Sequence, residues 1–365
     1  VNMIVIFLLL AIFPSIEALT CPKYQCKTKE YPFPDPSTCM NYDEANGIYY
    51  VNPCNYGYYC PAMLAQKSAN CTRPLPPPPH QRLAGESCFY DEDCYSNSTC
   101  VNGYCKGYLE NHSCSVHADC DVGLRCHQNT CVPQIPAGGK GCSIDDSDCV
   151  NNAGCDIVSS IDPTVNTCRP YFSISNEDPV NLNCTMEGDV NYLCKSGFCI
   201  ELNKGDTPQC YAAPKSSKHI PTSCTADTDC VSKTIGKLNR TFQRDCLCSY
   251  TKDGSGVCDI FPGDSPYVKY SEIIKSWTKS KGILKCNTYA RFSENCMDTW
   301  WEKKKIDELM YYDNYVYIYS VIHDAEDCVI QTYFPAYWEA KKQYDKESNA
   351  NGLIVGIFLL LGLAY

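Results

Sequence analysis

Cysteine is the residue type whose spacing in this chain most clearly implies chemistry. Residues 88–105 (CFYDEDCYSNSTCVNGYC) and 114–131 (CSVHADCDVGLRCHQNTC) both place five, five and four residues between successive cysteines. Cysteines at such spacings either form disulfides or hold a metal ion. Structural zinc sites are usually built from Cys-x2–4-Cys pairs, and the chain has no Cys-x-x-Cys motif. We therefore expect disulfides, and no metal site, redox motif or cofactor.

The four-cysteine arrangement continues along the chain. A third group has longer loops, a fourth (Cys184 to Cys210) is looser, and a fifth begins at Cys224 and holds five cysteines. In the fifth group Cys246 and Cys248 are too close for an unstrained mutual bridge, so each should pair elsewhere. In the first three groups we expect these residues to form disulfides: Cys88, Cys94, Cys100, Cys105, Cys114, Cys120, Cys126, Cys131, Cys142, Cys149, Cys155 and Cys168.

Loop length, rather than loop sequence, is what these groups repeat. An 18-residue segment cannot bury enough apolar surface to offset the entropy of ordering its chain, so cross-links must replace a core. Asp93 and Asp119 directly precede the second cysteine of their groups and should cap a turn by accepting backbone N–H bonds. Asn102-Gly103 predicts a two-residue turn flanked by Cys100 and Cys105, whose four-residue gap suits a hairpin disulfide.

Histidine could act as a catalytic base, but the sequence places little catalytic machinery around it. His323-Asp324 lies in the last third of the chain without a nucleophile motif beside it. The other histidines lie in a proline run, in cysteine groups or in a linker, where no packed cleft would hold a triad: His80, His112, His117, His127 and His219. The acidic run at 145–148 lacks the 12-residue loop of an EF-hand calcium site. We expect no catalytic residue and no enzymatic activity.

Aromatic residues gather outside the cysteine groups. All four tryptophans follow residue 258, and tyrosines are frequent both there and in residues 19–73. If exposed, Trp300 and Trp301, or the tyrosines of residues 47–59, could line a sugar or partner site. If buried, they would form the core of a small domain or pack on disulfides.

Both ends of the chain carry apolar segments. Ile4–Phe13 is an unbroken apolar run followed by small residues, which is typical of a secretory signal peptide and places the cysteines in an oxidising compartment. The last 13 residues are apolar and follow the small residues Ser348, Asn349 and Ala350. This tail is short for a membrane span. It favours a GPI-attachment signal, with attachment at one of those three residues, over a buried terminal helix.

Charge and glycosylation motifs agree with an extracellular location. A formal net charge of −11 disfavours nucleic acid and anionic lipid surfaces as partners. Five Asn-x-Ser/Thr sequons occur, at Asn70, Asn97, Asn111, Asn183 and Asn239. We expect a glycoprotein on the extracellular face of the plasma membrane, delivered by the secretory pathway. A lipid anchor would hold it to the membrane, and its ligand would be an unidentified protein or glycan.

Composition divides the chain into six parts. They are a signal peptide (1–18), an N-terminal six-cysteine domain (19–73), a proline-rich linker (74–84), an array of about five four-cysteine modules (85–258), an aromatic-rich helical domain (259–347) and the GPI-attachment signal (348–365). Apolar spacing predicts helices over about 271–279, from Ser293 to about Met310, and from Glu326. Residues 315–319 could be a strand or part of the second of these helices. The fifth group and the helical domain hold eight cysteines together, so at least one disulfide should join them.

The array resembles a known type of cysteine-rich domain. CFYDEDC at 88–94, followed by Cys100 and Cys105, resembles the N-terminal domain of Dickkopf proteins, and CTADTDC at 224–230 is similar. That domain belongs to secreted antagonists of a growth-factor receptor. The colipase-like domain associated with receptor binding has no counterpart here, so the resemblance does not imply receptor antagonism. The whole layout looks like GPI-anchored cysteine-rich surface proteins of protists, which implies a coat or adhesion role.

The expected fold is therefore a tandem of small disulfide-rich modules with short hairpins and little regular structure, followed by a mainly α-helical, aromatic-rich domain. We expect the array to be elongated, with an aromatic-rich cap at each end. The expected function is that of a non-enzymatic, GPI-anchored ectodomain for adhesion, recognition or protection. The alternatives are a secreted signalling modulator and a disulfide-rich protease inhibitor.

Overall fold

The computed structural model describes most of the chain between residues 19 and 346. The described residues are 19–31, 33, 35–55, 57–61, 66–73, 82–96, 98–143, 146–159, 161–180, 184–185, 188–218, 220–233 and 240–346. The predicted signal peptide, the proline run at 74–81 and the predicted GPI-attachment residues (Ser348, Asn349 and Ala350) lie outside these ranges. So do the sequons at Asn97, Asn183 and Asn239. These assignments stay predictions.

All 30 cysteines are paired in disulfides, which confirms the prediction of a disulfide-rich chain. In each of the five modules the first cysteine bonds to the third and the second bonds to the last. The pairs are Cys88–Cys100 and Cys94–Cys105, Cys114–Cys126 and Cys120–Cys131, Cys142–Cys155 and Cys149–Cys168, Cys184–Cys199 and Cys194–Cys210, and Cys224–Cys246 and Cys230–Cys258. Cys248 pairs outside the module, with Cys21, so it and Cys246 have different partners, as expected.

Each of the first three modules ends in an antiparallel hairpin. The hairpins are β5 (Thr99–Val101) with β6 (Tyr104–Lys106), β7 (Leu124–His127) with β8 (Thr130–Pro133), and β9 (Ala153–Asp156) with β10 (Thr167–Pro170). Asn102-Gly103 has positive φ at both positions, 54° and 81°, as the predicted turn requires. The predicted disulfide across this hairpin is wrong. Cys100 and Cys105 lie opposite each other, but they bond to Cys88 and Cys94, because a bridge across the hairpin would leave the first half of the module untied.

Side-chain hydrogen bonds hold the loop before the second cysteine of a module. Asp93 Oδ2 accepts from the N–H groups of Phe89 and Tyr90, at 2.8 and 3.0 Å, which confirms the predicted turn cap. The equivalent aspartates of three other modules also accept backbone N–H bonds: Asp119, Asp148 and Asp229. The position two residues earlier was not recognised from the sequence. Its side chain accepts a hydrogen bond from the N–H of the third cysteine in three modules: Asp91, His117 and Asp227.

The fourth and fifth modules are larger than the others. The fourth contains a three-stranded sheet in the order β11 (Asp189–Val190), β12 (Phe198–Ile200), β13 (Gln209–Cys210). The fifth contains the sheet β14 (Ser223–Cys224), β18 (Gly256–Cys258), β17 (Cys246–Cys248) and a separate hairpin of β15 (Val231–Lys233) and β16 (Thr241–Gln243). Longer loops between the cysteines supply these extra strands.

Four helices with defined bounds follow the array in the described residues, and one more covers 335–346. They are α1 (Ser265–Thr278), α2 (Glu294–Trp300), α3 (Lys303–Ile322) and α4 (Asp327–Tyr333). The predicted N-cap is confirmed, because the Ser293 hydroxyl accepts a hydrogen bond from the N–H of Cys296 at 3.1 Å. A single helix from Ser293 to Met310 is wrong: the helix ends at Trp300, and α3 starts after Glu302. Residues 315–319 are helical, within α3.

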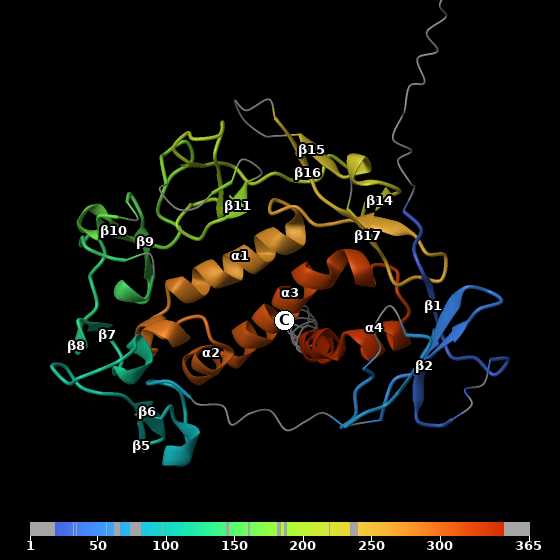
Figure 1. Cartoon of the computed structure of the whole chain (residues 1–365), viewed down its shortest axis with the longest axis horizontal. Coiled ribbons are helices and arrows are strands. Elements are labelled where there is room, and N and C mark those ends of the chain that lie inside the picture. The colour runs from blue at the N-terminus through green and yellow to red at the C-terminus, as the bar shows by residue number, and fades with distance from the viewer. Residues whose placement is uncertain are drawn as a thin grey trace, which may run out of the picture.

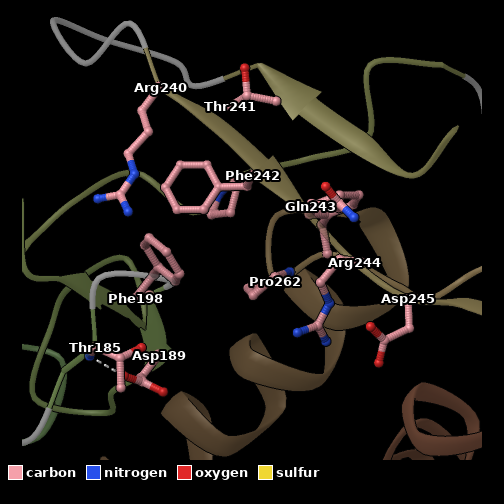
Figure 2. Close-up of a pocket in the computed structure, with 13 residues that line it drawn as sticks. Thr185, Asp189, Phe198, Arg240, Thr241, Phe242, Gln243, Arg244, Asp245 and Pro262 are labelled. Carbon is pink, nitrogen blue, oxygen red and sulfur yellow. Dashed lines mark hydrogen bonds between the residues drawn. The ribbon is translucent and has the colours of Figure 1, made fainter. Parts of the chain in front are cut away.

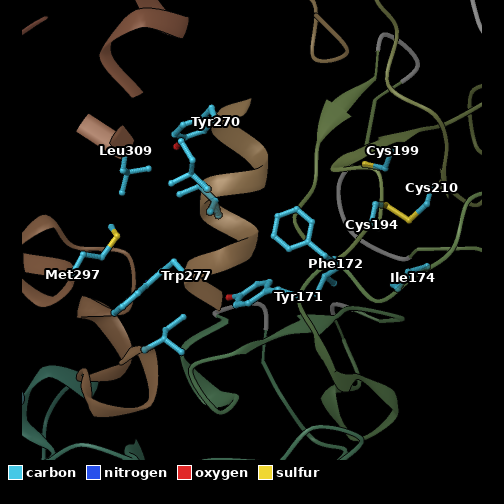
Figure 3. Packing of buried hydrophobic residues seen from close by; sticks show 14 of the residues in the cluster. Tyr171, Phe172, Ile174, Cys194, Cys199, Cys210, Tyr270, Trp277, Met297 and Leu309 are labelled. Carbon is cyan, nitrogen blue, oxygen red and sulfur yellow. A yellow bond between two sulfur atoms is a disulfide. The ribbon is translucent and has the colours of Figure 1, made fainter. Parts of the chain in front are cut away.

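The interiors of the modules differ. In the first and second modules the buried cluster consists of cysteines alone, so sulfur takes the place of a core, as expected for segments of this size. The fifth module has a cysteine cluster and also contributes Phe242 to an apolar cluster. The fourth module instead shares a large apolar core with the helices. Figure 3 shows this shared cluster on both sides of α1, with Leu309 on one side and Phe172 and Cys194 on the other. The fourth module and the helices therefore share one continuous interior.

The modules curve around the helices (Figure 1). The N-terminal sheet lies next to the fifth module and has the strand order β1 (Lys23–Cys26), β3 (Ile48–Val51), β2 (Thr38–Asp43), β4 (Ser68–Asn70), with β1 parallel to β3. The prediction of an elongated array between two caps is wrong. Modules without a core of their own gain buried contacts by packing on the helical segment, which an extended array would forgo.

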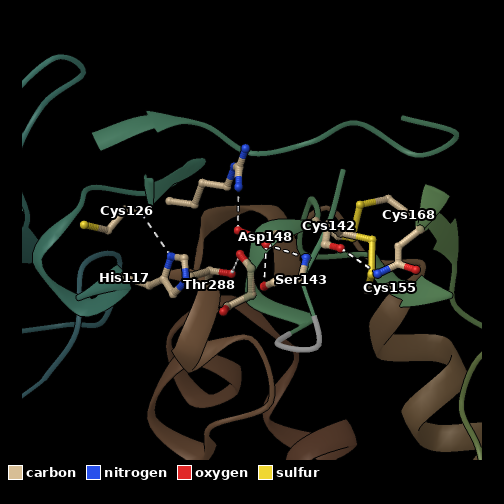
Figure 4. A network of polar contacts seen from close by, with 12 residues as sticks. His117, Cys126, Cys142, Ser143, Asp148, Cys155, Cys168 and Thr288 are labelled. Carbon is tan, nitrogen blue, oxygen red and sulfur yellow. Dashed lines mark hydrogen bonds and ion pairs between the residues drawn. A yellow bond between two sulfur atoms is a disulfide. The ribbon is translucent and has the colours of Figure 1, made fainter. Parts of the chain in front are cut away.

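One short segment, residues 286–291, joins the modules to the helices, and we call it the hub. The Asn287 side chain donates to the carbonyl oxygens of His117 and Cys120 in the second module, at 3.2 and 2.8 Å. The Thr288 hydroxyl donates a hydrogen bond to the Ser147 carbonyl of the third module at 2.6 Å. The Arg291 guanidinium donates to the Ala153 carbonyl of the same module at 2.9 Å. Figure 4 shows Thr288 among the polar side chains of the second and third modules.

Two disulfides join the N-terminal domain to the rest of the protein. Cys21 bonds to Cys248 of the fifth module, and Cys26 bonds to Cys328 of α4. The predicted disulfide between the array and the helical domain is wrong, because Cys286 and Cys296 bond to each other. The sequence could not reveal this, since the curvature that brings β1 to α4 depends on the whole assembly.

Candidate binding pocket between the fourth and fifth modules

A large cavity lies where two modules carry insertions. The first loop of the fourth module has nine residues (185–193) instead of five, and the second loop of the fifth module has 15 residues (231–245) instead of five. These insertions line a cavity of about 710 Å³ (Figure 2). In repeat proteins, insertions of this kind commonly form the binding face.

Phenylalanines form the apolar wall of this pocket. Phe198, Phe242 and Phe261 belong to one buried cluster, and the rings of Phe198 and Phe242 meet edge to face with centroids 5.8 Å apart. Gly188 is required beside them. Its φ of +87° favours glycine, and a Cβ there would lie 2.3 Å from the Phe198 ring. The fixed aromatic packing gives the pocket a firm base.

Two arginines line the pocket. The Arg240 guanidinium lies 5.9 Å from the centre of the Phe242 ring and donates to two backbone carbonyls of the fourth module at 3.3 Å. Arg244 donates to the Ile260 carbonyl at 3.2 Å and pairs with Asp259 at 3.0 Å. Burial raises the pKa of the Asp259 carboxyl by more than Arg244 lowers it. The backbone and Asp259 thus hold both guanidinium groups in place at the wall of the pocket.

Acidic and neutral polar groups complete the lining. Asp189 accepts a hydrogen bond from the N–H of Thr185, while Thr241, Gln243 and Asp245 are exposed on the opposite side. The lining therefore contains both hydrogen-bond donors and acceptors. This lining suits a ligand with many hydroxyl groups, because planar polar side chains can bind hydroxyls through several donors and acceptors at once.

The tryptophans singled out in the sequence do not line this pocket. Trp300 donates its Nε1–H to the Gly85 carbonyl at 2.7 Å, stacks on Tyr104 and lies 4.0 Å below the Lys285 ammonium. Trp301 packs on another tryptophan, with ring centroids 5.2 Å apart. Both are half-buried, so they pack within the domain, which is the second of the two alternatives that the sequence left open for them. Tyr58 and Tyr59, from the other aromatic segment, are exposed.

The other candidate residues have structural surroundings. His323 lies 3.1 Å from the Asp324 carboxylate, and its ring stacks on that of Tyr319 with centroids 6.2 Å apart. Within the acidic run at 145–148, the Asp148 carboxylate accepts hydrogen bonds from the Ser143 N–H and from the Arg125 guanidinium. Several groups of three cysteines, such as Cys88, Cys94 and Cys105, have sulfurs within 4.8 Å of one another, but these cysteines are oxidised, so they offer no thiolate. The sequons at Asn70 and Asn111 are exposed.

The pocket residues were not identified from the sequence. The signal that could have found them is the length of the two loops, since the spacing that the first two modules repeat is abandoned there. The inserted run Thr241-Phe242-Gln243-Arg244-Asp245 alternates polar and bulky residues, which is typical of a strand edge rather than a linker.

Comparisons of the chain with protein-family models, with curated proteins and with solved structures found no match. Among the helices of the described residues, none combines the length and the apolar character that a membrane crossing requires.

Proposed function

We propose that this protein is a non-enzymatic extracellular recognition protein, anchored to the plasma membrane by a lipid, and that the pocket between the fourth and fifth modules binds its ligand. The observation that carries the proposal is the placement of the pocket: it is built from insertions in a repeat array whose cysteines are all oxidised. Extensive disulfides fit a secreted or extracellular protein.

A saccharide is the ligand class that we propose for this pocket. Arg244, Gln243 and Asp245 supply hydrogen-bond donors and acceptors at the rim, and the buried rings of Phe198, Phe242 and Phe261 support the base beneath them. A cavity of about 710 Å³ is within the usual range of about 300–1,000 Å³ for small-ligand sites, which is enough room for a short oligosaccharide.

A glycan array tests the ligand class. The purified ectodomain should bind a defined subset of glycans, and Arg244→Ala should abolish that binding. The matched control is Lys204→Ala, because Lys204 is an exposed cation of the fourth module that does not line the pocket. Binding that survives Arg244→Ala, or no binding to any glycan, contradicts the saccharide proposal.

Phospholipase treatment of intact cells tests the anchor. Release of the protein into the medium by a phosphatidylinositol-specific enzyme supports a lipid-anchored surface protein. Protein that is already free in the medium before treatment would instead favour the alternatives of a secreted signalling modulator or protease inhibitor.

A further inference from the structure

A second cavity, separate from the module pocket, lies among the helices. It measures about 350 Å³ and is bordered by α1, α2 and α3 and by Tyr192 of the fourth module. Most of its wall is apolar and includes Ile274, Met297, Leu309 and Met310. This volume is near the lower end of the range for small-molecule sites, about 300–1,000 Å³. The size fits a ligand with one ring or a short chain.

The charged side chains in the described lining of this cleft are both acidic. Asp313 and Glu294 both line it, and no lysine, arginine or histidine occurs among the described residues that do so. The remaining polar atoms are the hydroxyls of Tyr192 and Tyr270. A negatively charged ligand would meet two carboxylates without a counterion, so the lining favours a cation.

Asp313 is the carboxylate that lies deeper. Its hydrogen-bond partner is the Tyr270 hydroxyl, which also interacts with the Tyr192 hydroxyl. Burial raises the pKa of Asp313. A carboxylate that is removed from water without an opposite charge is unfavourable, and a bound cation would offset that cost.

Aromatic rings and sulfur atoms surround the same space. The faces of tyrosine and phenylalanine rings attract cations, and Tyr192, Tyr270 and Phe292 all line the cleft. The thioethers of Met297 and Met310 are polarisable and adapt to ligands of different shape. A carboxylate among aromatic rings, with an apolar wall beyond it, matches a molecule that has a positive head and an apolar body.

We propose that this cleft binds a small organic amine, with its ammonium group paired to Asp313 and its apolar body between the aromatic rings and the methionines. The proposal is independent of the saccharide site, since the two cavities share no lining residue.

Isothermal titration of the full purified ectodomain with matched probes tests the proposal. Phenethylamine, tyramine and tryptamine carry an ammonium group, 2-phenylethanol replaces it with a neutral hydroxyl, and 3-phenylpropionate carries a negative charge. A charge-assisted hydrogen bond should make at least one amine bind about tenfold tighter than 2-phenylethanol, and 3-phenylpropionate should not bind. Equal affinity for the amines and the alcohol, or no binding of any of the three amines, would overturn the proposal.

Two variants and one control locate the site. Asp313→Asn preserves the shape of the side chain and should reduce the affinity for the amines to that for 2-phenylethanol. Met310→Phe should fill the cleft and weaken the binding of both the amines and 2-phenylethanol. Asp307→Asn is the matched control, because Asp307 is on the same helix but pairs with Lys303 at 3.1 Å and does not line the cleft. Unchanged amine binding by both Asp313→Asn and Met310→Phe would overturn the assignment. If Asp313→Asn does not fold, Met310→Phe and the wild-type probe series decide the question.

Discussion

Cys26 and Cys328 form a disulfide that spans 302 residues, with their Cα atoms 5.8 Å apart. The N–H of Cys26 also donates to the Glu326 carboxylate at 2.7 Å, so β1 is held to the start of α4 by a covalent bond and a hydrogen bond. The bond between Cys21 and Cys248 spans 227 residues and holds the same strand to the fifth module. The N-terminal domain therefore closes the arc of modules around the helices.

Removing this closure should destabilise the protein. In the chain-entropy model a disulfide that closes a very long loop contributes up to about 5 kcal/mol, and one that closes a short loop contributes about 3 kcal/mol. We expect the double variant Cys26→Ser/Cys328→Ser to lower the unfolding midpoint more than Cys54→Ser/Cys71→Ser, whose bridge spans 17 residues. Calorimetry measures both. An equal or smaller effect of the long-range pair would show that the N-terminal domain is not held by this closure.

The hub gives a second prediction. Asn287 is fully buried and its amide donates to two carbonyls of the second module. Asn287→Ala removes the side-chain donor to the Cys120 carbonyl and one of the two donors to the His117 carbonyl, which keeps the Cys120 N–H, and a buried group left unsatisfied costs about 1–3 kcal/mol. The free energy of unfolding should fall accordingly, as measured by chemical denaturation with the disulfides intact. Asn295→Ala, at an exposed position of α2, should have little effect, and similar losses for the two variants would count against the hub.

A buried ion pair joins the second and third modules. Arg125 Nη1 lies 2.6 Å from Asp148 Oδ1, with side chains 11% and 7% exposed (Figure 4). Arg125→Ala leaves the Asp148 charge buried, which typically costs about 3–5 kcal/mol. Lys106→Ala, which breaks a more exposed pair between the first and second modules, should cost about 1 kcal/mol or less. The same denaturation measurement distinguishes them, and equal losses would contradict this assignment.

The capping aspartates predict loss of stability in acid. Hydrogen bonds from the N–H groups of Phe89 and Tyr90 hold the pKa of Asp93 below its usual value, and those from Thr225 do the same for Asp229. A carboxyl whose pKa is lowered in the folded state stabilises the fold above the unfolded pKa of about 3.9. This contribution is lost as the pH falls through the folded value.

Thermal unfolding between pH 6 and pH 2 measures this effect. The midpoint of the wild-type protein should fall below about pH 4, while the double variant Asp93→Asn/Asp229→Asn should start lower and fall less steeply. Asp178→Asn, an exposed aspartate outside these turns, is the control. A parallel acid dependence in wild type and the double variant would show that the capping carboxylates do not contribute.

Local features of the modules were predictable from the sequence because they depend on neighbouring residues. The turn at Asn102-Gly103, the capping role of Asp93 and the N-cap at Ser293 all follow from side chains acting on backbone within a few positions. That Cys246 and Cys248 bond to different partners follows from the geometry that a disulfide requires of the backbone.

Relationships across the assembly could not be predicted in this way. Which cysteine meets Cys26 depends on the curvature of all five modules around the helices, and no local spacing encodes it. The module pocket combines two insertions far apart in the chain, near Asp189 and Phe242. The six residues of the hub contain no recognisable motif. Their side chains donate to backbone carbonyls, which every residue carries, so the sequences of the partner segments show no matching signal.

Peptide mapping without reduction tests the central claim most directly, that one pattern of cross-links shapes all five modules and two further bridges close the arc. Mass spectrometry of the natively purified protein should find no free thiol, first-to-third and second-to-last linkages in every module, and the linked pairs Cys21–Cys248 and Cys26–Cys328. Free thiols, or a peptide that links Cys100 directly to Cys105, would contradict the account.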